Sequence, residues 1–358
     1  MIKRRLIILG ATGSIGTTCL NAIRAKSLFA DVVGLVGFSS IEKLQSLSKE
    51  FNCPYILNTN STVLRDFLSS LSADIVLNGI AGAPGLEASL ISLECGFDLA
   101  LANKESIVMG GNFILNEAKR LGRKIIPVDS EHSAIYNLIK AHGEIDSVVI
   151  TASGGPFYQK KNLENVTVEE ATNHPTWKMG KKISIDSATL ANKGLEVIEA
   201  GFLFNLPSNK IEVTIHRQSV VHSMVRLANG AVYAQLSPPD MTLPIVGAVN
   251  DEINPLNDVV RPLSFKDLTL TFSSWSKEEF PLLKLAYIAL EKKGSYPIAF
   301  NAANEVAVGL FIDHKIKFTQ IAGITEKVMK YDFSKECNSF EEIVEVDNKA
   351  RTIALEGF

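Results

Sequence analysis

The feature that most constrains the fold is a short apolar run that passes directly into a glycine-rich turn. Residues 6–9 are apolar throughout, and Gly10-Ala-Thr-Gly13-Ser-Ile-Gly16 follows at once, before a helical stretch at 17–25. A strand, a glycine turn and a helix in this order are typical of dinucleotide-binding folds, because the backbone can approach a pyrophosphate that the helix N-terminus stabilises. The alternative is a tight turn without a ligand, since the spacing differs from G-x-G-x-x-G.

The second predicted strand, residues 31–37, indicates which dinucleotide is bound. No acid follows it to hold the ribose 2′-hydroxyl of NAD. Phe38-Ser39-Ser40 stands there instead, with Lys43 close behind. Two hydroxyls and a lysine could accept a 2′-phosphate, so the sequence favours NADP over NAD.

Further strands at 73–77, 98–102 and 124–128 predict a parallel sheet, and two of them end in polar clusters. The clusters are Asn103-Lys104-Glu105-Ser106 and Asp129-Ser130-Glu131-His132. In extended geometry Asp129 and Glu131 point to the same side, and two such carboxylates repel unless a cation lies between them. Oxygen ligands favour Mg²⁺ or Mn²⁺ over zinc. The alternative is an exposed acidic turn that caps a helix at 133–141.

The stretch from Asp186 to Glu196 (DSATLANKGLE) predicts one helix that opens at Asp186 or Ser187. Asn192 and Lys193 then share a face with Glu196, and a hydroxyl lies near the helix N-terminus. This arrangement suits an anionic, oxygen-rich ligand and a hard cation. A capped surface helix with an ordinary Lys/Glu pair is the alternative.

Two loops carry further candidate groups. Ser153-Gly-Gly-Pro-Phe157 follows a predicted strand at 146–151, and it is either a phosphate cradle or only a turn. His174-Pro-Thr-Trp177-Lys-Met-Gly180 combines an imidazole, an indole and a thioether. This composition suits a mobile flap that closes over an apolar part of a ligand, with a packed loop as the alternative.

Composition excludes several other classes of protein. The net charge of −3 gives no basic excess for nucleic acid or an anionic membrane surface. No run approaches the roughly 18 apolar residues of a membrane span, and the apolar run at 6–9 is too short for a signal peptide. The cysteines lie far apart without a CxxC motif, as expected of reduced thiols in a cytoplasmic protein.

The second half predicts a hairpin and a helical end. Residues 216–227 and 230–236 read as paired strands joined at Asn229-Gly230, a strong hairpin signal. Such a sheet could pair with a second copy, which predicts a homodimer. Helices are expected at 281 onward, from 301, at 319–331 and at 339–355. The predicted domains are 1–128, 129–250 and 281–358, with a linker at 251–280.

Eight motifs together resemble the 1-deoxy-D-xylulose-5-phosphate reductoisomerase family, from about residue 6 to about residue 330. They are the glycine turn, Ala102-Asn-Lys-Glu-Ser106, Val128-Asp-Ser-Glu-His132, Ser153-Gly-Gly-Pro-Phe157, the 174–180 and 186–196 segments, Gln218-Ser-Val-Val-His222-Ser-Met224 and Asn301-Ala-Ala-Asn-Glu305. The resemblance implies an α/β fold. Its parts would be an N-terminal Rossmann-type parallel-sheet domain, a central α+β catalytic domain with a flap and a C-terminal helical bundle.

The resemblance also implies roles for individual residues. NADPH would be bound by Thr12, Gly13, Ser14, Ile15, Asn103, Glu105 and Gly180. A divalent ion, Mg²⁺ or Mn²⁺ with Co²⁺ as a further candidate, would be bound by Asp129, Glu131 and Glu196, which with Lys104 form the catalytic set. The sugar-phosphate substrate would contact Lys104, Ser130, Glu131, Ser153, His174, Trp177, Ser187, Asn192, Lys193 and Glu196.

The implied reaction is the rearrangement and NADPH-dependent reduction of 1-deoxy-D-xylulose 5-phosphate to 2-C-methyl-D-erythritol 4-phosphate in isoprenoid precursor biosynthesis. One departure concerns the cofactor, because the family commonly carries a Gly-Lys/Arg-Asn-like segment where this chain has Phe38-Ser39-Ser40. A semialdehyde-dehydrogenase-type enzyme is a rival, but it needs a cysteine between Cys95 and Cys337, where the sequence has none. A nucleotide-sensing binding protein would be expected to lack at least one of the three carboxylates.

Overall fold

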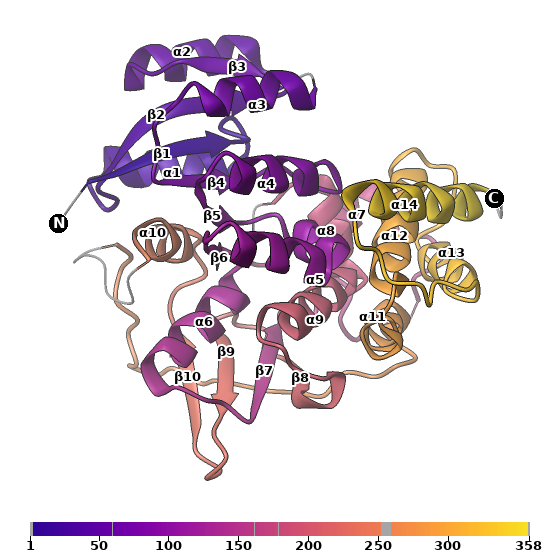
Figure 1. Cartoon of the computed structure of the whole chain (residues 1–358). Coiled ribbons are helices and arrows are strands. Elements are labelled where there is room, and N and C mark those ends of the chain that lie inside the picture. The colour runs from indigo at the N-terminus through magenta and orange to yellow at the C-terminus, as the bar shows by residue number, and fades with distance from the viewer. Residues whose placement is uncertain (1–2, 59, 161, 178, 252–258, 357–358) are drawn as a thin grey trace. The chain divides into compact units, whose positions relative to one another are not determined.

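The computed structural model describes residues 3–58, 60–160, 162–177, 179–251 and 259–356. The chain divides into two compact units. Unit 1 comprises residues 1–106, 114–141 and 240–262, and unit 2 comprises residues 107–113, 142–239 and 263–358. The elements of both units are labelled in Figure 1.

Unit 1 is built on a six-stranded parallel sheet with the order β3-β2-β1-β4-β5-β6. The strands are β1 (Arg4–Leu9), β2 (Ala30–Gly37), β3 (Tyr55–Leu57), β4 (Ile75–Asn78), β5 (Asp98–Leu101) and β6 (Ile125–Pro127). This order is that of dinucleotide-binding doubly wound folds. Leu6, Ile7, Ile8 and Leu9 are fully buried, as expected of a strand covered on both faces. The predicted Rossmann-type sheet is confirmed.

Among the described residues of unit 1, seven helices follow the strands of this sheet along the chain. They are α1 (Ser14–Arg24), α2 (Ile41–Phe51), α3 (Ser61–Ser69), α4 (Pro84–Glu94), α5 (Lys104–Arg120), α6 (Ser130–His142) and α10 (Thr242–Asn250). Helix α1 packs against α10, and α3 packs against α4. Helix α5 bends at Gly111, whose φ of 45° lies outside the helical region.

Unit 2 contains a four-stranded mixed sheet with the order β10-β9-β7-β8. The strands are β7 (Ser147–Ala152), β8 (Ile211–Ile215), β9 (Val221–Arg226) and β10 (Val232–Leu236). Strands β7 and β8 are parallel, whereas β9 is antiparallel to β7 and β10. The predicted β9–β10 hairpin is confirmed, but its first strand begins at Val221 rather than at 216, because a turn at residues 216–219 intervenes.

The remaining helices of unit 2 include a C-terminal bundle. They are α7 (Val168–Thr172), α8 (Lys181–Ala188), α9 (Ala191–Leu203), α11 (Pro281–Lys292), α12 (Tyr296–Ile312), α13 (Gln320–Val328) and α14 (Phe340–Leu355), with a 3₁₀ turn at Ser208–Lys210. Helix α12 packs against α11, α13 and α14, and α11 also packs against α9 (Figure 1). The bundle is as predicted, although α12 begins at Tyr296 and not at residue 301, with proline in its first turn.

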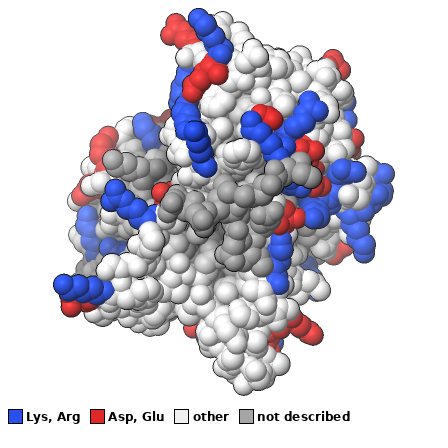
Figure 2. Space-filling view, turned by 90° about the vertical axis from the view of Figure 1, so that its left-hand side faces the viewer, with Lys and Arg blue, Asp and Glu red and all other residues white. Residues whose placement is uncertain are grey.

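The predicted domain boundaries at 128, 250 and 280 remain predictions, and part of the predicted linker, residues 252–258, lies outside the described residues. Among the described helices, none has the length and apolar character needed to cross a bilayer. On the face shown in Figure 2, basic and acidic side chains lie side by side.

Candidate active site

The glycine turn of unit 1 joins β1 to α1. Gly10 has a φ of +75°, and a Cβ there would lie 2.8 Å from the carbonyl oxygen of Gly79, so a larger residue would strain this turn. Gly13 is the N-cap residue of α1, and no side chain caps this end of the helix. Ser14 and Ile15 begin the first helical turn. The backbone N–H groups at this helix end are the donors that the predicted pyrophosphate site requires.

Lys43 lies beside this turn. Its ammonium donates to the carbonyl oxygen of Thr12 at 2.9 Å and to the Thr17 hydroxyl at 3.3 Å. The Ser40 hydroxyl makes no capping hydrogen bond at the start of α2, and Phe38 is 82% exposed. The structure therefore brings the lysine singled out at the end of β2 to the glycine turn.

Asn103 is the buried N-cap residue of α5. Its Oδ1 accepts from the backbone N–H of Ser106 at 2.9 Å, and its Nδ2 donates to the carbonyl oxygens of Ile80 and Gly82 at 2.8 and 2.9 Å. The same amide donates to the Glu105 carboxylate at 3.0 Å. Asn103 therefore fixes the loop that follows β4 and the start of α5, which carries the next two predicted site residues, Lys104 and Glu105.

The acidic cluster of unit 1 lies where β6 passes into α6. The ligand oxygens of Asp129 and Glu131 lie within 4.8 Å of each other, and the Ser130 hydroxyl donates to Glu131 at 2.5 Å. Asp129 forms an ion pair with Lys104, and both side chains are largely buried. The expectation of extended geometry is wrong for Glu131, which lies in the first turn of α6. This burial contradicts the alternative of an exposed acidic turn.

His132 was not assigned a role from the sequence, yet it lies in this cluster. Its imidazole is fully buried, and its Nδ1 lies 4.0 Å from an Asp129 oxygen. Its position three residues after Asp129, in the first turn of a helix, is the signal that could have identified it.

In unit 2, the predicted polar face is present on α9. The Asn192 amide donates to Glu196 at 2.5 Å, and the Lys193 ammonium forms an ion pair with the same carboxylate. Glu196 is 1% exposed and Lys193 is 3% exposed, which contradicts the alternative of a decorated surface helix. A buried carboxylate with a cation and an amide as partners is typical of a functional site.

The expectation that one helix opens at Asp186 or Ser187 is wrong. Helix α8 ends at Ala188 and α9 begins at Ala191, with Leu190 between them at a φ of 55°. Ser187 therefore lies in the last turn of α8 and not at a helix N-terminus. The Asn192, Lys193 and Glu196 spacing is unaffected, because all three belong to α9.

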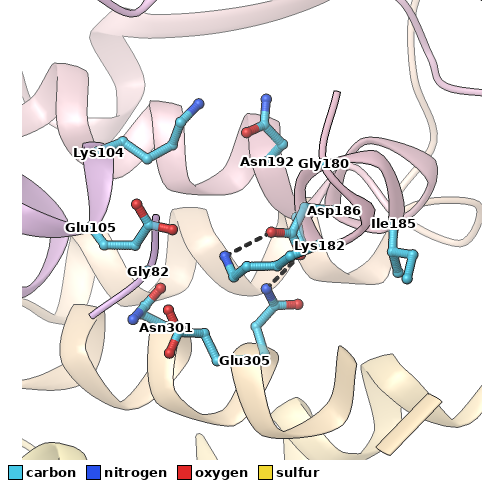
Figure 3. A network of polar contacts seen from close by, with 12 residues as sticks. Gly82, Lys104, Glu105, Gly180, Lys182, Ile185, Asp186, Asn192, Asn301 and Glu305 are labelled. Atoms are coloured by element: carbon cyan, nitrogen blue, oxygen red, sulfur yellow. Dashed lines mark hydrogen bonds and ion pairs between the residues drawn. The ribbon is translucent and has the colours of Figure 1, made fainter. Parts of the chain in front are cut away.

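Asp186 belongs to a buried network that the sequence did not indicate. Its carboxylate accepts from the Lys182 ammonium at 2.9 Å (Figure 3). It also accepts from the Asn304 amide of α12 at 2.8 Å. Asp186 is 1% exposed and Asn304 is fully buried. This network ties α8 to the C-terminal bundle, within the Asn301–Glu305 motif whose role the sequence left open.

The Ser153–Gly155 turn approaches the end of α8. A Cβ on Gly155 would lie 2.6 Å from the carbonyl oxygen of Ser187, so only glycine allows the two backbones to come this close. Gly155 also has a φ of +64°. Two hydroxyls predicted to bind substrate, those of Ser153 and Ser187, thus belong to adjoining segments of unit 2.

His174 adds an imidazole to this group, with its Nε2 at 3.0 Å from the Ser153 hydroxyl. Its Nδ1 accepts from the backbone N–H groups of Thr176 and Trp177 at 3.1 and 2.9 Å. Burial, together with the positive charge of Arg217, lowers the pKa of His174 to about 4, so the ring is neutral at pH 7. Residue 178 of the predicted flap lies outside the described residues, and Gly180 is the N-cap residue of α8.

Models of one protein family match most of the chain. Residues 6–71 and 57–111 match the 1-deoxy-D-xylulose 5-phosphate reductoisomerase model, residues 125–204 match a C-terminal domain of that enzyme, and residues 236–353 match a second one. The chain belongs to the 1-deoxy-D-xylulose 5-phosphate reductoisomerase family.

Relatives of the reductoisomerase family match over nearly their whole length. The reductoisomerase of Treponema denticola is 47% identical, with 99% of this chain and 97% of the relative covered, and that of Treponema pallidum is 44% identical with the same coverage. A crystal structure of DOX-P reductoisomerase with NADPH, fosmidomycin and magnesium has a TM-score of 0.89 and 37% identity, covering 99% of this chain and 98% of that one. The Zymomonas mobilis enzyme with NADPH also has a TM-score of 0.89, at 35% identity and 99% coverage of both chains.

Proposed function

We propose that this chain converts 1-deoxy-D-xylulose 5-phosphate to 2-C-methyl-D-erythritol 4-phosphate, with NADPH and a divalent cation, in isoprenoid precursor biosynthesis. The observation that carries the proposal is the full-length match to reductoisomerases, 47% identical for the Treponema denticola enzyme. The chain also has the three carboxylates proposed as metal ligands, Asp129, Glu131 and Glu196. A non-catalytic homologue is disfavoured for the same reason.

The glycine turn fits a dinucleotide. Gly10, which has no Cβ, leaves room for a pyrophosphate, and the N-terminus of α1, which carries no side-chain cap, offers N–H donors for it. Thr12, Gly13, Ser14 and Ile15 would hold the phosphates, and Asn103, Glu105 and Gly180 would bound the nicotinamide end. NADPH supplies the hydride that reduces the rearranged aldehyde.

The carboxylates fit a hard divalent ion. Asp129 and Glu131 offer oxygen ligands within 4.8 Å of each other, and oxygen is the donor that Mg²⁺ and Mn²⁺ prefer. We infer that Glu196 completes this set and that the ion supplies Lewis-acid and template chemistry. The Lys104 ammonium offsets the charge of Asp129 and can hold or donate a proton next to substrate oxygens. Ser130 orients Glu131 through its hydrogen bond.

The phosphate of the substrate is assigned to unit 2. Ser153, Ser187, Asn192 and Lys193 would hold it and the neighbouring hydroxyls, and His174 and Trp177 would cover the carbon chain. The phosphate end does not react, so its binding energy orients the end that does.

A turnover assay tests the proposal. NADPH oxidation with 1-deoxy-D-xylulose 5-phosphate is expected to require Mg²⁺ or Mn²⁺ and to stop with EDTA. Glu196→Gln keeps the shape of the side chain, and we expect it to lose most turnover while NADPH binding is retained. Undiminished activity after thorough chelation, or near-normal turnover of Glu196→Gln, would contradict the metal assignment.

We further propose a cytoplasmic homodimer. Strand β10 is an edge strand of the mixed sheet, and its Val232 and Tyr233 are 53% and 39% exposed. Exposed apolar residues on a free edge favour pairing with a second copy.

A further inference from the structure

Arg217 contacts the Ser153–Gly155 turn, although nothing in the sequence pattern assigned it a role. The turn follows β7, Arg217 follows β8, and these two strands are parallel neighbours. Their carboxyl ends therefore lie at the same edge of the sheet, where α/β folds bind ligands. One guanidinium nitrogen, Nη1, donates to the carbonyl oxygens of both Ser153 and Gly155 at 2.7 Å.

The turn depends on such an external contact. Gly154 and Gly155 both have positive φ, +79° and +64°, and two successive glycines lose more conformational entropy on ordering than any other pair. The guanidinium lies 5.6 Å from the centroid of the Tyr158 ring, which holds it in place by a cation–π contact. Arg217 therefore joins two carbonyl groups of a segment with little stiffness of its own.

The geometry of the turn determines what the Ser153 hydroxyl can do. His174 accepts two backbone N–H groups at Nδ1, so the proton of its neutral ring lies on Nε2, which donates to the Ser153 oxygen. The backbone N–H of Gly155 donates to the same oxygen at 3.2 Å. Because these two hydrogen bonds occupy the lone pairs of the hydroxyl oxygen, its own hydrogen can be donated to an anion.

We propose that Arg217 is a positioning residue of the substrate-phosphate anchor, which holds the Ser153–Gly155 turn so that the Ser153 hydroxyl donates to the phosphate while bonded to His174. This inference rests on the proposed function. The positive charge of Arg217 also favours the binding of a dianionic phosphate nearby. Because the phosphate is the unreactive end of the substrate, loss of Arg217 weakens binding more than it slows the chemical step.

Three variants of the full-length chain test the inference. Arg217→Gln is expected to raise KM for the sugar phosphate about tenfold, the loss of a charge-assisted contact, with kcat within about twofold. Arg217→Lys is expected to restore most of the affinity, because an ammonium can also donate to both carbonyl oxygens. Arg226→Gln is the matched control, since Arg226 lies on β9 of the same sheet and pairs only with the exposed Glu212 among the described contacts of its side chain.

A second readout does not depend on turnover. The ring ¹⁵N signals of His174 report whether Nε2 keeps its proton, and we expect Arg217→Gln, but not Arg226→Gln, to change them. The inference would be overturned if Arg217→Gln had the same KM as Arg226→Gln and unchanged His174 signals. It would also be overturned if Arg217→Gln lowered kcat at constant KM. A wild-type chain without turnover would refute the proposed function alone, because the His174 comparison would still stand.

Discussion

We expect the preference for NADPH over NADH in this chain to depend on Lys43. This lysine places a positive charge at Thr12 of the glycine turn, next to the end of β2 where an acid would favour NAD. The family's usual basic segment is replaced here by Phe38-Ser39-Ser40. Lys43 can therefore compensate for the cation that these three positions lack.

Substitution Lys43→Gln is accordingly expected to weaken NADPH binding about ten- to a hundredfold, the value of a hydrogen bond to a charged group. NADH binding should change little, because NADH has no 2′-phosphate. Fluorescence titration with each cofactor measures the two dissociation constants and hence the preference for NADPH over NADH. Lys49→Gln, in the last turn of the same helix, removes the same charge farther from the glycine turn and is the control. An equal loss for NADPH and NADH would contradict the assignment.

At the scale of single elements, local patterns predicted some features and failed at others. The strand, glycine turn and helix at residues 6–24 have strong local signals, and they form in the predicted order, although α1 begins at Ser14 rather than at residue 17. The break between α8 and α9 has no glycine or proline to mark it, and Leu190 takes a left-handed conformation with 2% exposure. Burial of a leucine in the core outweighs its backbone preference, and no local rule contains that information. Strand β8 was not predicted, although its buried residues alternate at Ile211, Val213 and Ile215, a pattern that indicates a strand.

Helix α12 is expected to support the substrate site through Asn304. Asn304→Ala removes a hydrogen bond to a buried carboxylate, so the free energy of unfolding should fall by about 1–3 kcal/mol. The end of α8 that carries Ser187 should also become less ordered, which raises KM for substrate. Urea unfolding and steady-state kinetics measure both effects. The exposed Asn348→Ala on α14 is the control, and equal stability of the two variants would show that the Asp186 contact contributes little.

At the scale of the whole molecule, the fold class and the family could be predicted because motifs spread over the chain occur in a fixed order. The site was predicted as a list of residues, and much less of its internal geometry followed from the sequence. Neither the Asp186–Asn304 contact nor the Arg217–Ser153 contact has a local signal, since each joins residues more than 60 positions apart. Such contacts depend on tertiary packing, which periodicity and spacing do not describe.

Assembly is the remaining property of the whole chain, and β10 makes it testable. The strand is at the edge of its sheet, and its residue 232 is a half-exposed valine. We expect light scattering after size-exclusion chromatography to give twice the 39.0 kDa of one chain. Val232→Lys should shift the protein toward the monomer, because a lysine on an edge strand opposes pairing with another strand. Val344→Lys, on the exposed face of α14, should leave the mass unchanged. A wild-type chain that is monomeric at micromolar concentration would contradict the proposed dimer. A Val232→Lys dimer as stable as the control dimer would show that the interface does not involve β10.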